Sequence, residues 1–133
     1  MFTTESLQKP LTIIGEIRLV LTCSSSLEFF DFVGRLCVVT KEGKSLNLCD
    51  GMVRVVSMDA DYGEVVSPSS VDGTYTQLTD PTRRILKVFT KERQVTLNFS
   101  LWSTAFTFKR GERIRLHVCS AAHPKWIRNY GTG

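Results

Sequence analysis

Apolar and polar side chains alternate with a period of two along most of this 133-residue chain. A period of two places successive side chains on opposite faces and therefore predicts β-strands. Strands with this pattern are expected at residues 16–23, 30–39, 52–57, 85–91, 94–102 and 112–120. Each has one apolar face and one more polar face, as in antiparallel sheets that are covered on one side.

Turn-forming residues separate these segments, in the stretches "IIGE", "KEGK", "CDG" and "KRGE". No stretch shows ten or more residues with helical periodicity and caps. Seven or eight short strands with such punctuation predict an all-β fold, an antiparallel β-sandwich or jelly roll. The length fits one domain over residues 1–133.

Residues 59–84 are rich in Gly, Pro, Ser, Thr and Asp and interrupt the strand pattern. We expect a long loop here, and loops of this length are usually functional or mobile. Residues 63–67, "GEVVS", are a candidate for a short strand inside it.

The composition is that of an ordinary globular protein, with 42% hydrophobic and 23% charged residues. No apolar run is long enough for a membrane helix, and the N-terminus lacks the features of a signal peptide. A cytoplasmic location is therefore expected. The net charge of +4 raises the question of nucleic acid. Because the charges are scattered and the densest set mixes in a glutamate, a solvated strand face is favoured and no nucleic-acid partner is expected.

The four cysteines have no metal-finger spacing, and reduced thiols are expected. Cys37 and Cys49 lie at nearly mirrored distances around the turn "KEGK", so a cross-strand disulfide between them is the alternative.

A catalytic centre is not expected. A Gly-x-Ser-x-Gly nucleophile motif and a Gly-rich phosphate loop are both absent from the sequence. His117 lies between Arg115 and Cys119 on a polar strand face, where a positive neighbour disfavours the charged imidazole. His123, before Pro124, is the better functional candidate of the two histidines. Asp59 and Asp61 fall short of a calcium site, so no metal and no cofactor are expected.

Trp102, on the polar phase of its strand, and Trp126, in the tail, invite a comparison of two roles. Together they could stack a sugar, which would make the chain a stand-alone binding module for a carbohydrate or small ligand. Alternatively, both pack against a neighbouring domain or subunit, because aromatic residues and Arg are enriched in interfaces. Packing is favoured.

Several phrases occur together in a characteristic order: "LTIIGEIRLVL", "DFVGRLCVV", "EGKSLNLCDGMVRV" and "FSLWSTAFTFKRGERIRLHVCSAAHPKWIRN". This ordered set resembles the C-terminal β-sandwich of cocaine-esterase-like (CocE/NonD) serine hydrolases, which is shared with X-Pro dipeptidyl-peptidases. The most specific pieces are Asp31-Phe32-Val33, Arg35-Leu36, Leu48-Cys49-Asp50-Gly51, Arg54, Phe108, Gly111, Arg113-Ile114-Arg115-Leu116, Pro124 and Arg128-Asn129.

The resemblance implies a jelly roll with a galactose-binding-like topology that packs on an α/β-hydrolase catalytic domain and shapes one side of its active-site cleft. The Ser-Asp-His triad would lie in that partner domain. Pro124, Trp126, Arg128 and Asn129 would form an interface patch that faces it. The resemblance also implies a further strand after Gly133, and a sandwich lacking that strand has an unpaired edge. For the chain by itself, we expect a second copy to cover the patch.

Overall fold

The computed structural model describes residues 1–25, 27, 29–57, 78–80, 85–88 and 94–130. Eight β-strands and no helix are found in these residues, which confirms the all-β prediction. The strands are β1 (Phe2–Thr3), β2 (Leu11–Ser24), β3 (Phe29–Val39), β4 (Ser45–Ser57), β5 (Leu78–Asp80), β6 (Ile85–Val88), β7 (Gln94–Phe108) and β8 (Arg113–Cys119).

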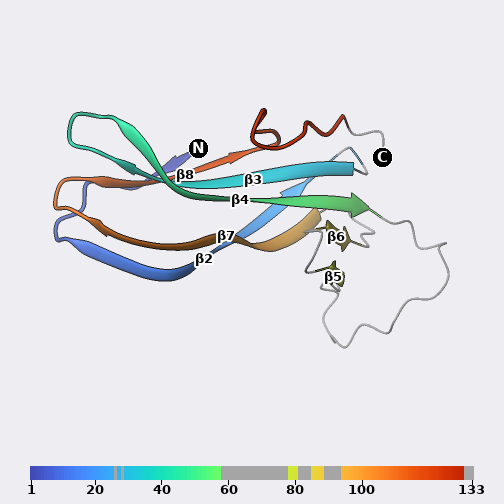
Figure 1. Ribbon diagram of the computed structural model, residues 1–133, viewed down its shortest axis with the longest axis horizontal. Helices are drawn as coiled ribbons and strands as arrows, with labels where there is room; N and C mark the ends of the chain where they lie inside the picture. Colours follow the sequence, from blue (N-terminus) through green and yellow to red (C-terminus); the bar gives the residue numbers. More distant parts are fainter. Residues whose placement is uncertain (26, 28, 58–77, 81–84, 89–93, 131–133) are drawn as a thin grey trace.

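The strands form two layers, as the sandwich prediction requires (Figure 1). One layer is a six-stranded sheet with the order β1-β8-β3-β4-β6-β5, and the other is the pair β2-β7. All ladders are antiparallel except the one between β4 and β6, which is parallel. Strand β5 follows residues 58–77 in the sequence, and the short β5–β6 ladder forms one edge of the larger sheet.

The core lies between the layers and consists of the apolar phase of the alternating strands. The central buried cluster comes from β2, β4 and β7 and consists of Leu19, Cys49, Val53, Val55, Leu97, Phe99 and Leu101. Strand β3 adds buried side chains of its own, Val33, Cys37, Val38 and Val39, whereas Phe32 on β3 and Leu116 on β8 are only half-buried against the cluster. Leu19 of β2 and Leu97, Phe99 and Leu101 of β7 lie on the apolar phase of the alternation, and all four are buried.

Two glycines directly opposite each other on β3 and β4 allow the layers to approach closely. A Cβ atom on Gly51 would stand 2.0 Å from the backbone carbonyl oxygen of Ser100 on β7. A Cβ on Gly34, its partner in the ladder, would stand 2.7 Å from the terminal carbons of Leu19 and Leu101. Since real Cβ atoms do not approach backbone that closely, only glycine fits at position 51.

The turns expected at "IIGE" and "CDG" are wrong, because β2 and β4 run through these residues. All four cysteines are free, which confirms the expected reduced thiols and makes the alternative Cys37–Cys49 disulfide wrong. A register irregularity follows Leu36, so that Cys49 lies opposite Leu36 and Cys37 lies opposite Asn47. Within the long segment 59–84 the structure describes one short strand, β5, whereas the strand suggested at 63–67 lies outside the described residues. The predicted strand at 85–91 is confirmed as β6 up to Val88, and its remainder also lies outside them.

Candidate functional site

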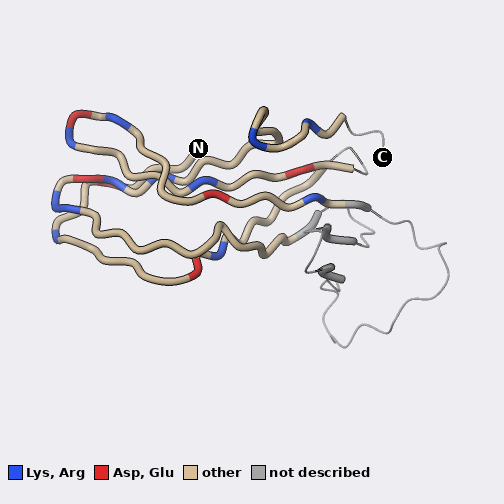
Figure 2. Tube along the Cα trace, viewed as in Figure 1, with Lys and Arg blue, Asp and Glu red and all other residues tan. Residues whose placement is uncertain are grey.

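Strands β3 and β4 each carry an aspartate followed four residues later by an arginine: Asp31 and Arg35, Asp50 and Arg54. Side chains four residues apart on a strand share a face. The antiparallel register places Asp31 opposite Arg54 and Arg35 opposite Asp50. The face concerned is the side of the six-stranded sheet away from β2 and β7, which we call the outer face. Two oppositely oriented ion pairs thus lie on this face, with the pair Val33–Met52 between them. Figure 2 shows the acidic and basic positions along the two strands.

The first pair is complete. Arg54 donates from Nε and Nη2 to the two carboxylate oxygens of Asp31, at 2.9 Å each. Asn129 of the C-terminal tail adds a hydrogen bond from its side-chain amide to Oδ1 of Asp31, at 2.8 Å. Asp31 is only 6% exposed, and a buried carboxylate requires such partners. The hydrogen bonds with Asp31 raise the pKa of the Arg54 guanidinium.

The second pair is incomplete. Lys125 of the tail donates to Oδ1 of Asp50 at 2.5 Å. Arg35 Nε stands 3.6 Å from Oδ2 of Asp50, which is an ion-pair distance but too long for a hydrogen bond. Asp50 is 7% exposed, and neither its Oδ2 nor the Nε of Arg35 has a hydrogen-bond partner among the described residues.

His117 borders this second pair, because it lies opposite Arg35 in the ladder between β3 and β8. Its Nε2 is buried and has no hydrogen-bond partner among the residues that the structure describes. Burial lowers the pKa of the imidazole, and the positive charges of Arg115 and Arg35 lower it further. The shift agrees in direction with the sequence-based expectation, although burial and not the neighbouring charge is the main cause. We call Arg35, Asp50, His117 and Lys125 the Asp50 cluster.

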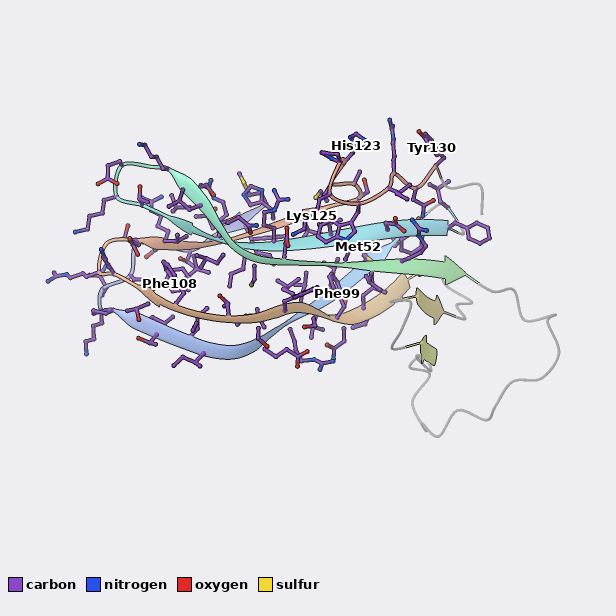
Figure 3. All side chains as sticks on the ribbon, viewed as in Figure 1. Met52, Phe99, Phe108, His123, Lys125 and Tyr130 are labelled. Atoms are coloured by element: carbon purple, nitrogen blue, oxygen red, sulfur yellow. The ribbon has the colours of Figure 1, made fainter. Side chains whose placement is uncertain are left out.

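The C-terminal tail, residues 120–130, crosses the outer face above these pairs (Figure 1). It makes one tight turn, closed by a backbone hydrogen bond from Trp126 to Ala122, and its His123–Pro124 peptide is cis. Lys125 points toward the strands, whereas His123 and Tyr130 point away from them (Figure 3). The tail is therefore held at two points, through Lys125 on Asp50 and Asn129 on Asp31.

The outward side of the tail is apolar, aromatic and cationic. Ile127 is 86% exposed and Tyr130 is 76% exposed. The Arg128 guanidinium lies 5.5 Å from the centre of the Tyr130 ring, in the range of a cation–π contact. We call five exposed residues of this segment the tail patch: His123, Pro124, Ile127, Arg128 and Tyr130.

The structure separates the candidate residues named from the sequence into three groups. His123, Pro124 and Arg128 lie in the tail patch. Trp126, half-buried with the Lys125 ammonium 4.8 Å from its ring centre, and Asn129, bonded to Asp31, belong to the attachment of the tail. Trp102 lies on β7 in the other layer, so the two tryptophans do not share one surface.

Trp102 is itself unusual. It is 58% exposed and has a φ of 77°, in the left-handed region that bulky residues rarely adopt. Glu16 lies opposite Ser103 and Arg18 opposite Ser100, so one residue of β2 faces two of β7 there. At this β-bulge Trp102 faces outward, and the alternation of β7 shifts by one residue. The buried positions are therefore odd-numbered up to Leu101 and even-numbered at Phe108.

Asp31, Asp50, Lys125, Ile127 and Tyr130 were not among the candidates named from the sequence. A signal for the two aspartates exists: each interrupts an apolar strand, and each has an arginine four residues later. No signal marked Lys125, because its partner lies 75 residues away.

The arrangement supports attachment and contact better than catalysis. Among the described residues, no group of three or more His, Cys, Asp or Glu side chains could hold a metal ion. Nor does any helix in the described part of the chain have the length and apolar character to cross a membrane. The two buried carboxylates of the outer face, Asp31 and Asp50, each accept a hydrogen bond from the tail.

Comparison with known proteins agrees with this picture. A family model described as "X-Pro dipeptidyl-peptidase C-terminal non-catalytic domain" matches residues 1–133. Cocaine esterase of Rhodococcus sp. (strain MB1 Bresler) is 28% identical over 132 residues, which cover 99% of this chain and 19% of that protein. A solved α-amino acid ester hydrolase matches 99% of the chain with a TM-score of 0.61 and 23% identity. A CocE/NonD family hydrolase from Staphylococcus aureus matches 99% of it with a TM-score of 0.61 and 13% identity.

The chain spans about a fifth of the length of these relatives, 19% of two of them and 24% of the third. At identities under 25%, the structural matches show the fold and no more.

Proposed function

The chain belongs to the family of X-Pro dipeptidyl-peptidase C-terminal non-catalytic domains, and on that premise we propose that it is the accessory β-sandwich of a serine hydrolase. In this proposal it packs on an α/β-hydrolase catalytic domain and shapes one side of that domain's active-site cleft. Acyl transfer through a serine nucleophile would take place in the partner domain. The relatives that match are hydrolases about five times longer than the matched segment, which leaves room for such a domain.

The tail patch is the surface that we assign to the partner domain. The observation that carries this assignment is that Ile127 and Tyr130 are exposed although two buried aspartates hold the tail at fixed positions. An ordered apolar and aromatic surface with an adjacent arginine has the composition of an interface centre. Because the tail is already ordered, docking would not require the entropy loss of folding it.

A second copy of the chain is the other occupant that we consider for this patch. Sedimentation of the 133-residue chain at micromolar concentration separates the two proposals. A dimer that Ile127→Glu dissociates would favour the second copy, and a monomer would leave the patch to a hydrolase domain.

The test of the docking face uses the complete polypeptide that the gene encodes. In that polypeptide, Ile127→Glu is expected to lower both the melting temperature and the turnover of a chromogenic ester. Ile14→Glu is the matched control, because Ile14 is 81% exposed but lies on β2 in the opposite layer. Equal behaviour of the two variants would refute the tail patch as the docking face.

A further inference from the structure

The smaller layer of the sandwich has long strand edges. Strands β2 and β7 are 14 and 15 residues long, and within the described residues each pairs only with the other (Figure 1). The six-stranded sheet, in contrast, ends on the much shorter β1 and β5. The bulge at Trp102 interrupts β7, and its extra residue belongs to that strand. Strand β2 keeps a strict alternation of more and less exposed positions from Thr12 to Ser24, so its edge is the long and regular one.

Strand β2 lacks the features that usually prevent pairing at a free edge. Such features are Lys or Pro on the strand, charges that point inward, and bulges. β2 contains neither Lys nor Pro, and its two charged residues, Glu16 and Arg18, lie on the exposed phase. Gly15 has a φ of 114°, but the register with β7 continues through it without a shift. The strand can therefore accept a neighbour along its length.

Pairing at this edge would cover apolar side chains on both faces of β2. On the exposed face, Ile14 and Val20 are 81% and 63% exposed. On the face toward the core, Ile17 and Leu21 pack against the central cluster but are only half-buried. A fitting partner is a strand with apolar side chains on both faces, and β2 itself has that composition.

The residues of β2 complement one another when a second copy runs antiparallel, with Ile17 opposite Ile17. On the exposed face, this register pairs Thr12 with Thr22, Ile14 with Val20, and Glu16 with Arg18 of the second copy. On the inward face, it pairs Ile13 with Leu21 and Gly15 with Leu19. Polar, apolar and charged positions thus each meet a suitable partner.

The same two charges disfavour other registers. A shift of two residues in one direction places Glu16 opposite Glu16, and in the other direction it places Arg18 opposite Arg18. Like charges directly across a ladder are destabilising. A shift of one residue brings the exposed face of one strand beside the inward face of the other. One register therefore satisfies both the charges and the apolar faces.

We propose that β2 is a self-association edge, at which two copies of this chain pair antiparallel about a two-fold axis at Ile17. The two β2–β7 pairs then become one layer with the strand order β7-β2-β2-β7. Such a contact uses the same surface on both copies and closes on itself, so it produces dimers and not fibres. It lies in the layer opposite the tail patch and does not depend on the proposed docking to a hydrolase domain.

Charge reversal tests this register in the 133-residue chain. Sedimentation at micromolar concentration is expected to show a dimer for the wild-type chain. Arg18→Glu and Glu16→Arg each place like charges opposite one another at two symmetric positions, so each should weaken the dimer about tenfold or more. An equimolar mixture of the two variants restores opposite charges in both pairs and should dimerise like the wild type. Because Glu16 and Arg18 form an exposed ion pair, neither substitution is expected to unfold the chain.

Lys44→Glu, a charge reversal in the exposed turn between β3 and β4, is the control and should leave the dimer intact. A wild-type chain that sediments as a monomer would overturn the proposal. So would charge variants that leave the dimer intact, a mixture that stays dissociated, or a dimer that Ile127→Glu dissociates, since Ile127 lies in the tail patch. Ile14→Glu should weaken the same dimer, so in the docking test on the complete polypeptide it is the ester turnover that separates Ile14→Glu from Ile127→Glu.

Discussion

Replacing Gly51 by alanine should be among the most damaging small substitutions in this protein. The new methyl carbon would stand 2.0 Å from the Ser100 carbonyl oxygen and 2.9 Å from the Leu101 Cα, both backbone atoms of the opposite layer. An ordinary contact needs about 3.4 Å or more, so β4 and β7 must separate by more than 1 Å, on the order of a carbon radius. Overpacking of a core costs about 1–3 kcal/mol when side chains can adjust. Here the obstacle is backbone, and a loss of about 3 kcal/mol or more is expected.

Gly34→Ala is the matched control, because Gly34 lies directly opposite Gly51 in the same ladder. Its added methyl would clash only with the terminal carbons of two leucine side chains, which can rotate away, and would touch the Phe99 ring at an ordinary 3.6 Å. We expect a loss of about 1 kcal/mol for this variant. Urea unfolding followed by tryptophan fluorescence measures both. The close approach of the layers would be refuted if the Gly51 variant were no less stable than the Gly34 variant.

Three further predictions concern the outer face and the tryptophans. The pKa of His117 is lowered in the folded chain, so just below the ordinary value of 6.5 only the unfolded state binds its proton, and the unfolding free energy should fall as the pH drops through that window. His117→Gln should flatten this fall between pH 7 and pH 5. An unchanged slope would contradict the prediction. Asp31→Ala should lower the unfolding free energy by about 3 kcal/mol, because it breaks a buried bidentate pair with Arg54. Glu16→Ala, in the exposed pair with Arg18, should lower it by less than about 1 kcal/mol. Equal losses in urea unfolding would show that burial of the pair is unimportant. Since the two tryptophans lie in different layers, titration with a panel of sugars should leave tryptophan fluorescence unchanged, and saturable quenching by any of them would revive the carbohydrate-binding alternative.

Strand positions could be predicted from the sequence because they depend on local periodicity. Leu97, Phe99 and Leu101 alternate with polar residues, and all three are buried in the core. The pairing of strands could not be predicted in the same way, since it depends on contacts between distant segments. The parallel ladder between β4 and β6 is an example, because local alternation does not distinguish it from an antiparallel one. The bulge at Trp102 shifts the inward phase of β7, but the pairing of β7 with β2 that fixes its position is again a contact between distant segments.

The sequence pointed to residues of the tail but not to the contacts that hold it. His123, Pro124 and Arg128, named from the sequence, lie on the exposed side of the tail. The reason for its order lies in Lys125 and Asn129, each of which binds an aspartate more than 70 residues earlier in the chain. The assignment of an interface to the tail stays a prediction.

The most direct test of the proposed role is to identify the native polypeptide that carries this sequence. An antibody raised against the 133-residue chain would isolate it from its source, and a fluorophosphonate probe would mark any active serine hydrolase in the isolate. The account predicts a labelled polypeptide much larger than 15.0 kDa, or a labelled hydrolase that is isolated together with the chain. A 15.0 kDa polypeptide without any labelled companion would contradict it.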